Sequence, residues 1–337
     1  FIGIGAALLI ALPKYKLLGY ASWILAALNI LLLGVLLVPG VPDWIVTPRN
    51  GARAWISLGP VDLQPSEPAK IVFVLVLAWY MRFREEHRTF RGLVLIGALS
   101  IAPIALIMLQ PDLGQAMLFI PPLLAIFLAA GAKKRHLFAV LAAALLAAPA
   151  TYPFLMPHQK ARIVGLVKQI QGDRTADEDV NMQPVTAQRL IGAGGLTGAG
   201  EDLSRALIHY NRLPERHNDM VFSVVVNRWG MMGGLAVIGL SLTWIVGALA
   251  TAAAAKDPFA RLICVGASGF LVGHLIVNVG MNLGLLPIVG VTLPFVSYGG
   301  SSLLTMWVMT GLILNVGLRR PRAPGRPSFE YAGGDDD

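Results

Sequence analysis

The chain has 337 residues, of which 55% are hydrophobic and only 14% are charged. A soluble domain carries about 25% charged residues, so this composition excludes a chain dissolved mainly in water and favours one that crosses a lipid bilayer. The formal net charge of +8 comes from short basic clusters between apolar runs rather than one basic stripe, so we expect no nucleic-acid partner. A single cysteine, Cys264, excludes a disulfide within the chain.

Apolar runs of membrane-spanning length recur along the whole sequence. They do not alternate with polar residues, which favours helices over the strands of a barrel. We expect nine spans, near residues 1–12 (partial), 17–38, 68–82, 92–109, 115–130, 137–156, 219–253, 262–282 and 302–318. The run 219–253 is too long for one perpendicular helix, so it should tilt, project beyond the membrane or break at Gly233 and Gly234. The sequence therefore predicts an all-α polytopic membrane protein.

The distribution of Lys and Arg among the loops predicts the topology. Loops at 14–16, 82–91, 133–135 and 256–261, and the segment after residue 318, are basic and should be cytoplasmic. Loops 39–67, 110–114, 157–218 and 283–301 then face outward, so the stretches rich in glycine, proline and polar residues fall on one side of the membrane. We expect one transmembrane domain, 1–320, that includes the large outer loop 157–218, and a disordered cytoplasmic tail, 321–337.

The first two outer loops end in polar residues close to the start of a membrane helix. Ser66 fits an N-cap, and Glu67 and Lys70, three residues apart, share one helix face. This block is either a cap with an anchoring ion pair or, with Arg53, a binding site for phosphate. Asp112 lies in a very short loop, where it either caps the helix that starts near Gly114 or faces a substrate.

The long outer loop 157–218 contains Arg162, a glycine-rich run at 192–200 and His217, and ends at Asp219. The glycines either let backbone N–H groups approach phosphate or simply allow turns. Asp219 stands directly before an apolar helix, where it is either an N-cap or a partly buried carboxylate whose raised pKa suits a general base. His217 and Asp219 are two candidate metal ligands without a third.

The last outer loop, 283–301, is irregular and apolar with polar residues near its end. Irregular backbone at membrane depth is tolerated only inside protein or against a polar cavity, so this loop should form a cavity wall. The hydroxyls of Ser297, Tyr298 and Ser301 and the amides of Gly299 and Gly300 are candidates for binding sugar or pyrophosphate.

Four blocks in this order resemble the SEDS family of shape, elongation, division and sporulation proteins, which includes RodA and FtsW. They are Gly51–Ile56 with Gln64–Lys70, Gln110–Gly114, Leu213–Asp219, and Gly284–Ser302. The resemblance covers nearly the whole chain and is closer to RodA than to FtsW. It implies the ten-helix SEDS fold, with the first helix absent here, and places the essential aspartate of the family on Asp219. Where the family has two glutamates after this aspartate, the chain has Asn227 and Arg228.

The resemblance also implies an activity: polymerisation of lipid II into glycan strands at the outer face of the bacterial cytoplasmic membrane, for cell elongation and shape. The expected partners are a class B penicillin-binding protein, other proteins of the elongation or division complex, and membrane lipids. Asp219 would take the proton from the 4-hydroxyl of the acceptor sugar, with inversion at the anomeric carbon of a donor that leaves its polyprenyl pyrophosphate.

Arg53, Lys70 and Arg162 would offset the charge that develops on the pyrophosphate. A divalent cation, Mg²⁺ or Mn²⁺, is compatible with this chemistry, and no organic cofactor is expected. The candidate substrate-binding residues are Arg53, Glu67, Lys70, Asp112, Arg162, His217, Ser297, Tyr298, Gly299, Gly300 and Ser301. Two alternatives from other classes stay open: a transporter that moves lipid II across the bilayer unchanged, and a non-catalytic scaffold of the cell-wall complex.

Overall fold

The fold was analysed in a computed structural model of the chain. It describes residues 1–319 with gaps at 43, 50–51, 58, 60–61, 85–88, 174, 176–180 and 212. Residues 320–337 lie outside the described part, so the disordered tail at 321–337 stays a prediction.

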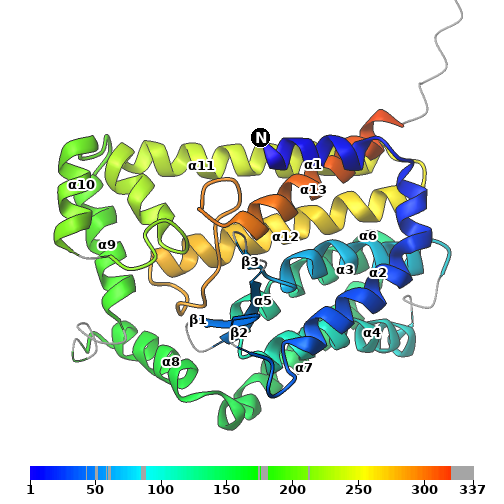
Figure 1. Cartoon of the computed structure of the whole chain (residues 1–337), viewed down its shortest axis with the longest axis horizontal. Helices are drawn as coiled ribbons and strands as arrows, with labels where there is room; N and C mark the ends of the chain where they lie inside the picture. The colour runs from blue at the N-terminus through cyan, green and yellow to red at the C-terminus, as the bar shows by residue number, and fades with distance from the viewer. Residues whose placement is uncertain are drawn as a thin grey trace, which may run out of the picture.

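Thirteen α-helices and three short strands make up the described part of the chain (Figure 1). The helices are α1 Ile2–Ala11, α2 Tyr15–Val35, α3 Ser66–Met81, α4 Phe90–Leu109, α5 Leu113–Met117, α6 Ile120–Ala130, α7 Lys134–Thr151, α8 Pro157–Ile170, α9 Met182–Gly194, α10 Glu201–Tyr210, α11 Val221–Ala254, α12 Pro258–Asn282 and α13 Gly300–Leu318. A 3₁₀ turn, η2, covers Tyr152–Phe154, and the strands are β1 Val46–Arg49, β2 Ala52–Ser57 and β3 Asp62–Leu63.

Each of the nine expected spans coincides with a helix, and α5 and α6 together fill one of them. Within the described residues, five helices are long and apolar enough to cross a membrane. They cover 15–35, 113–130, 221–254, 258–282 and 300–318, and the bent helix α4 would be a sixth. The helical, multi-spanning class is therefore confirmed, while the count of nine spans stays a prediction.

The centre of the membrane part is α12, which packs against α3, α6, α11 and α13. Phe73 of α3, Phe119 beside α6 and Phe270 of α12 form a buried cluster, with ring centroids 5.0 to 6.2 Å apart. A methyl group built on Gly269 would lie 2.5 Å from the Cα of Pro122 in α6. Small residues on α12 therefore let the neighbouring backbones approach closely, as is typical of membrane helices.

Helix α11 is broken, at a different residue from the expected one. Gly230 has φ 70° and ψ −171°, whereas Gly233 and Gly234 lie within the helix. The break packs against the end of α9, where Met231 N donates to Gly195 O at 2.9 Å and Ala199 N donates to Asn227 O at 2.9 Å. The glycine-rich run is thus partly explained by backbone packing, because a methyl group on Gly230 would lie 2.2 Å from Leu196 O.

The first outer loop contains a small antiparallel sheet that we did not expect, in the order β1-β2-β3. Val46 pairs with Ile56, and Ile56 pairs with Leu63 on the other side of β2. Asn50 and Gly51 stand between β1 and β2 in the sequence, a pair typical of two-residue hairpin loops. The all-α class therefore holds for the membrane part, and the outer loop adds a short sheet to it.

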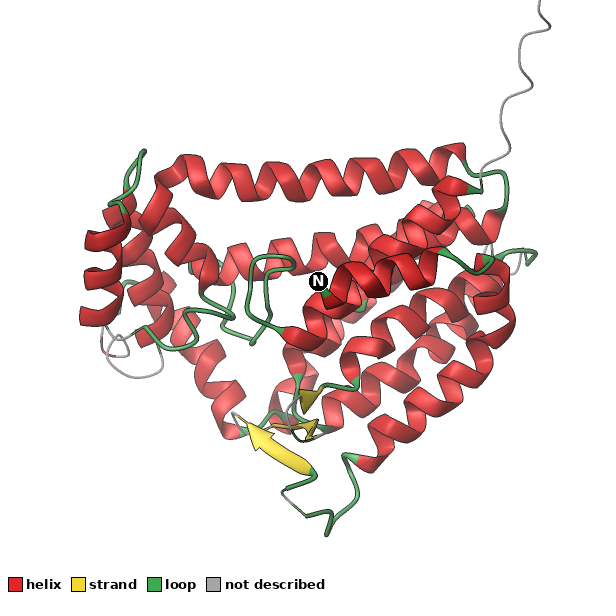
Figure 2. Cartoon of the chain, turned by 45° about the horizontal axis from the view of Figure 1, so that its top comes forward, coloured by secondary structure: helices red, strands yellow, loops and turns green. Residues whose placement is uncertain are grey.

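The connections of the bundle gather at two opposite ends (Figure 1). At one end, the α1–α2 and α11–α12 connections meet the end of α13, and Arg319 there donates to Ala11 O at 3.0 Å. At the other end lie the sheet, α8 to α10, the start of α11, which Asp219 precedes, and the loop before α13, also visible in Figure 2. The two sets of loops that we assigned to opposite faces are therefore separated, and we call the second set the Asp219 end.

Candidate active site

Asp219 lies two residues before α11 and is held there through its main chain. Its carbonyl oxygen accepts hydrogen bonds from Asn278 Nδ2 at 3.0 Å and Asn282 Nδ2 at 2.9 Å, both from α12. The N-cap residue of α11 is Met220, which has no capping side chain. The alternative interpretation of Asp219 as an N-cap is therefore wrong.

The carboxylate of Asp219 is half-buried among charged neighbours. Burial and the nearby Glu215 and Asp112 carboxylates raise its pKa to about 7, and Arg162 opposes this rise. Within the described residues, no donor lies at hydrogen-bonding distance from its two oxygens. A carboxyl group of this kind can exchange a proton near neutral pH, as a general base must.

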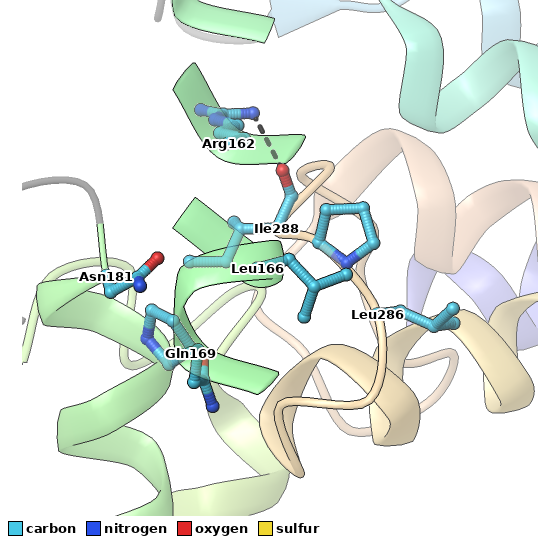
Figure 3. A pocket seen from close by; sticks show the side chains of 8 residues that line it. Arg162, Leu166, Gln169, Asn181, Leu286 and Ile288 are labelled. Carbon is cyan, nitrogen blue, oxygen red and sulfur yellow. Dashed lines mark hydrogen bonds between the residues drawn. The ribbon is translucent and has the colours of Figure 1, made fainter. Parts of the chain in front are cut away.

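Arg162 of α8 is the cation whose charge lowers the pKa of Asp219. Its Nη1 donates to Ile288 O at 3.0 Å, which ties α8 to the loop before α13 (Figure 3). Burial lowers its pKa, while Asp219 and Asp112 both raise it. Because an arginine stays protonated in proteins, this side chain carries a positive charge beside two carboxylates.

Asp112 is the second carboxylate of this group, and it caps a helix. Its Oδ1 accepts from Gln115 N at 3.1 Å, and its Oδ2 accepts from Gln64 Nε2 at 3.1 Å. Burial raises its pKa to about 6, although both hydrogen bonds and Lys70 act in the opposite direction. The capping role is confirmed, and binding of substrate by Asp112 stays a prediction.

Glu67 and Lys70 form the anchoring ion pair, with 2.7 Å between Lys70 Nζ and Glu67 Oε1. Both side chains are fully buried, and Lys70 Nζ also lies 3.0 Å from His274 Nε2. Ser66 begins α3, whose N-cap is Pro65, so the expected cap at Ser66 is wrong. In this structure the ammonium of Lys70 contacts Glu67 and His274. A role for Lys70 in holding phosphate stays a prediction.

The loop before α13 is fastened to the segment that carries Asp219. Ser297 Oγ donates to Asn218 O at 2.7 Å, and Tyr298 N donates to His217 O at 2.7 Å. A methyl group built on Gly290 of this loop would lie 3.6 Å from Asp219 Oδ2. The loop therefore forms one wall beside the carboxylate, as we expected of it.

Other candidate residues lie around this wall. Ser301 Oγ donates to Asp62 O at 3.0 Å, Gly299 and Gly300 form the start of α13, and the ring of Tyr298 is exposed. His217 is also exposed, and its Nε2 accepts from Arg216 Nε at 3.2 Å. Arg53, on β2, donates to Val41 O at 2.9 Å. Their roles in binding substrate stay predictions.

A small open pocket lies next to Arg162, between α8, α9 and the loop before α13 (Figure 3). Its lining combines polar and apolar side chains: Arg162, Leu166, Gln169, Asn181, Pro184, Leu286, Pro287 and Ile288. Arg162 therefore lines this pocket, and its charge also interacts with that of Asp219.

The described residues contain no group of three or more His, Cys, Asp or Glu side chains that could hold a metal ion by themselves. The negative charge of Asp112 acts on the Asp219 carboxylate. Mg²⁺ is commonly bound by one or two carboxylates together with substrate phosphates. These two residues fit such a site only if the substrate completes it.

At the two positions where the resembling family has glutamates, Asn227 and Arg228 make structural contacts. Asn227 is fully buried, and its Nδ2 donates to Leu190 O at 2.8 Å. Arg228 forms an ion pair with Glu201 of α10. Both side chains fasten the broken part of α11 to α9 and α10.

Three residues of the site were missed by our sequence reasoning: His274, Asn278 and Asn282 of α12. All three are fully buried. A signal was present, because they lie four residues apart within an apolar helix, and polar side chains inside a membrane helix usually line a site or bind a neighbouring chain.

The chain is similar to known proteins over most of its length. The family model FTSW_RODA_SPOVE, described as "Cell cycle protein", matches residues 1–321. The peptidoglycan glycosyltransferase RodA of Treponema pallidum is 29% identical over 80% of this chain and 78% of its own length. A probable peptidoglycan glycosyltransferase FtsW of Nitrosococcus halophilus is 35% identical over 85% of this chain and 73% of its own length.

Solved structures show the same fold. A chain from a peptidoglycan synthase complex, described as coordinating polymerisation and crosslinking, matches 95% of this chain and 88% of its own length, with a TM-score of 0.78 and 32% identity. The rod shape determining protein RodA of Thermus thermophilus matches 96% of this chain and 87% of its own length, with a TM-score of 0.65 and 29% identity. Because relatives of both names occur, the closer likeness to RodA stays a prediction.

Proposed function

The chain belongs to the FtsW, RodA and SpoVE family of membrane proteins, and from that premise we propose that it is a peptidoglycan glycosyltransferase in which Asp219 is the general base. The observation that carries the assignment of Asp219 is its carboxylate, which has a pKa of about 7, receives no hydrogen bond from the described residues and lies beside the cation Arg162.

The proposed reaction joins two lipid-linked sugars. Asp219 takes the proton from the 4-hydroxyl of the acceptor sugar, and the oxygen attacks the anomeric carbon of the donor from the side opposite the leaving group. The new C–O bond forms as the bond from the anomeric carbon to the pyrophosphate oxygen breaks, and its electron pair leaves with the polyprenyl pyrophosphate. Inversion at the anomeric carbon follows from this single displacement.

Among the candidate cations, the surroundings of Arg162 support it best as the group that offsets the developing negative charge. It lies in the electrostatic surroundings of Asp219, and it keeps its charge in a half-buried position. Charged donors in a site with little water stabilise a transition state more strongly than they would in solution. Mg²⁺ or Mn²⁺ would add to this effect if Asp112, Asp219 and the pyrophosphate bind it together.

The proposed setting is the bacterial cytoplasmic membrane, with the Asp219 end outside and the C-terminus in the cytoplasm. The basic loops at the opposite end support this orientation through the positive-inside rule. The substrate would be lipid II, and the partner a class B penicillin-binding protein, since a related chain occurs in a peptidoglycan synthase complex. The clustering of Arg162, Asp112 and Asp219 at one end favours catalysis over transport, which needs polar groups along a path.

The test compares Asp219→Ala with Asp257→Ala, using purified protein and lipid II. Asp257 is the N-cap of α12 at the opposite end of the bundle, so its loss changes another carboxylate close to a helix start. Loss of a general base lowers turnover by about 100-fold or more. We therefore expect Asp219→Ala to lose glycan polymerisation to that extent, and Asp257→Ala to retain it per folded molecule. Unchanged polymerisation by Asp219→Ala would refute the role of this carboxylate.

A further inference from the structure

Helix α12 carries a stripe of three polar side chains at the level of Asp219: His274, Asn278 and Asn282. They are spaced four residues apart, lie on one face of the helix and are fully buried. Burying an amide or an imidazole is costly unless its polar atoms are hydrogen-bonded. The groups that satisfy these side chains therefore indicate why the stripe is present.

Two of the three side chains bind the same atom. Asn278 Nδ2 and Asn282 Nδ2 both donate to the carbonyl oxygen of Asp219, at 3.0 and 2.9 Å. A carbonyl oxygen has two lone pairs, so this pair of amides occupies both of its acceptor positions. The peptide group next to the Asp219 side chain is thus fixed to α12, the central helix.

The same stripe fixes what surrounds Asp219. Asn282 Oδ1 accepts from Ser223 N at 3.1 Å, which supplies α11 with a cap that its own Met220 lacks. Asn278 Nδ2 also donates to Val291 O at 2.7 Å. Because Gly290 of that loop lies beside the carboxylate, one side chain fixes both the main chain of Asp219 and the wall that faces it.

We propose that Asn278 and Asn282 are positioning residues that hold the Asp219 carboxylate at a fixed depth and direction toward the acceptor hydroxyl. The inference rests on the proposed role of Asp219. General-base catalysis depends on holding the reacting groups within about half an ångström of a productive geometry, and helices do so better than loops. The main-chain hydrogen bonds leave both carboxylate oxygens free to accept the proton.

The experiment uses Asn278→Leu and Asn282→Leu, with Asn315→Leu as the matched control. Asn315 of α13 is equally buried and also donates to two main-chain carbonyls, Ile10 O at 2.6 Å and Pro13 O at 2.7 Å, but at the opposite end of the bundle. The full chain is purified, and thermal unfolding is measured together with kcat, KM for lipid II and the pH dependence of kcat.

All three variants should unfold at lower temperature, because each loses two or more hydrogen bonds to buried carbonyls. Only Asn278→Leu and Asn282→Leu should lower kcat, by about tenfold or more, with KM within about threefold of the parent value. Their acidic limb should also move to lower pH, because a carboxylate that leaves its place beside Glu215 and Asp112 gains water, and its pKa falls. Arg162 lowers the pKa of Asp219, so movement of the carboxylate away from Arg162 offsets part of this fall.

Adding Asn278→Leu to Asp219→Ala should cause no further loss of the residual rate, because a positioning residue has no effect without the group that it positions. If a leucine variant does not fold, Asn278→Ser and Asn315→Ser provide the same comparison with a smaller change. Equal kcat in the Asn278, Asn282 and Asn315 variants would overturn the positioning role and leave the proposed function intact. Full polymerisation by Asp219→Ala would instead overturn the proposed general-base role of Asp219, on which the positioning role rests.

Discussion

The two ends of the helical bundle contain the same types of polar side chain, but their aspartates differ in the hydrogen bonds that they accept. At the end opposite Asp219, Asn315 and Arg319 donate to carbonyls in the last turn of α1, and both oxygens of Asp257 accept hydrogen bonds, from Tyr15 Oη at 3.0 Å and Phe259 N at 3.2 Å. At the Asp219 end, Asn278 and Asn282 bind main-chain carbonyls in the same way. There, however, the carboxylate of Asp219 itself is left without a donor from the described residues.

This difference separates a carboxylate that anchors a helix, Asp257, from the carboxylate that we propose for proton transfer, Asp219. Hydrogen bonds favour the ionised form of a carboxylate, although at Asp112 burial outweighs two of them and its pKa still rises to about 6. A carboxylate that is buried near other carboxylates and lacks such bonds costs stability but accepts a proton readily. Structures often tolerate a destabilised group of this kind where a function needs it.

The largest effect that we expect concerns the break of α11, which occurs only at the Asp219 end. Gly230→Ala should destabilise the protein by about 3 kcal/mol, because Gly230 has a backbone conformation that almost only glycine adopts, and a methyl group there would overlap Leu196 O. Thermal unfolding in detergent measures the change. The control is Gly239→Ala in the same helix, where a methyl group meets no atom within 4 Å. Equal stability of the two variants would contradict the packing described for the break.

The next effect concerns the charge opposite Asp219. Arg162→Met should lower kcat/KM by about 30-fold, or about 2 kcal/mol. Because Arg162 lowers the pKa of Asp219, its removal should raise that pKa above 7. A general base works only when deprotonated, so the acidic limb of the pH profile should move to higher pH.

Arg205→Met is the control for Arg162, since it removes the same charge from an exposed position on α10. Its pH profile should match that of the parent protein. An acidic limb that stays in place in Arg162→Met would mean that Arg162 does not face the titrating group.

The smallest effect is a gain in stability. The pKa of Asp219 is about 7 in the folded protein and 3.8 in its ordinary state, so the folded state holds the proton more tightly. The ionised carboxylate therefore costs stability, a cost that is absent below about pH 4 and complete above about pH 7. Asp219→Asn should raise the free energy of unfolding on the order of 1 kcal/mol at pH 8 and much less at pH 5.

Asp257→Ala, at the other end of the bundle, should change the free energy of unfolding in the opposite direction. It removes an N-cap and should cost about 1 kcal/mol at pH 8. Urea or thermal unfolding at both pH values measures the pair. A loss of stability in Asp219→Asn at pH 8 would show that the Asp219 carboxylate is stabilised by contacts like those of Asp257.

Much of the fold follows from local sequence patterns. The apolar runs predicted the membrane helices, because about 20 apolar residues in a row are needed to cross the bilayer core. The short loop at Asp112 predicted a helix cap, and the spacing of Glu67 and Lys70 predicted an ion pair, since neighbouring positions on a helix face interact whatever the tertiary structure.

Other features were not available from local patterns. Asn50 and Gly51 lie between β1 and β2 in the sequence, but the alternation of the two strands is too short to stand out within a loop. The site of the break in α11 could not be selected among Gly230, Gly233 and Gly234, because the choice depends on α9, about 30 residues earlier in the chain, which supplies backbone partners only to the segment around Gly230.

The sequence by itself determined that the chain is a membrane protein of many helices, that its polar loops gather at one end, and that Asp219 begins a membrane helix there. Only the tertiary structure decided that the main chain of Asp219 is bound by Asn278 and Asn282, that Arg162 lowers the pKa of its carboxylate, and that Lys70 contacts Glu67 and His274. The physical reason is the separation in sequence over which each effect acts. Hydropathy and helix spacing act between residues a few positions apart, whereas the pKa and position of a carboxylate depend on groups brought beside it from distant parts of the chain.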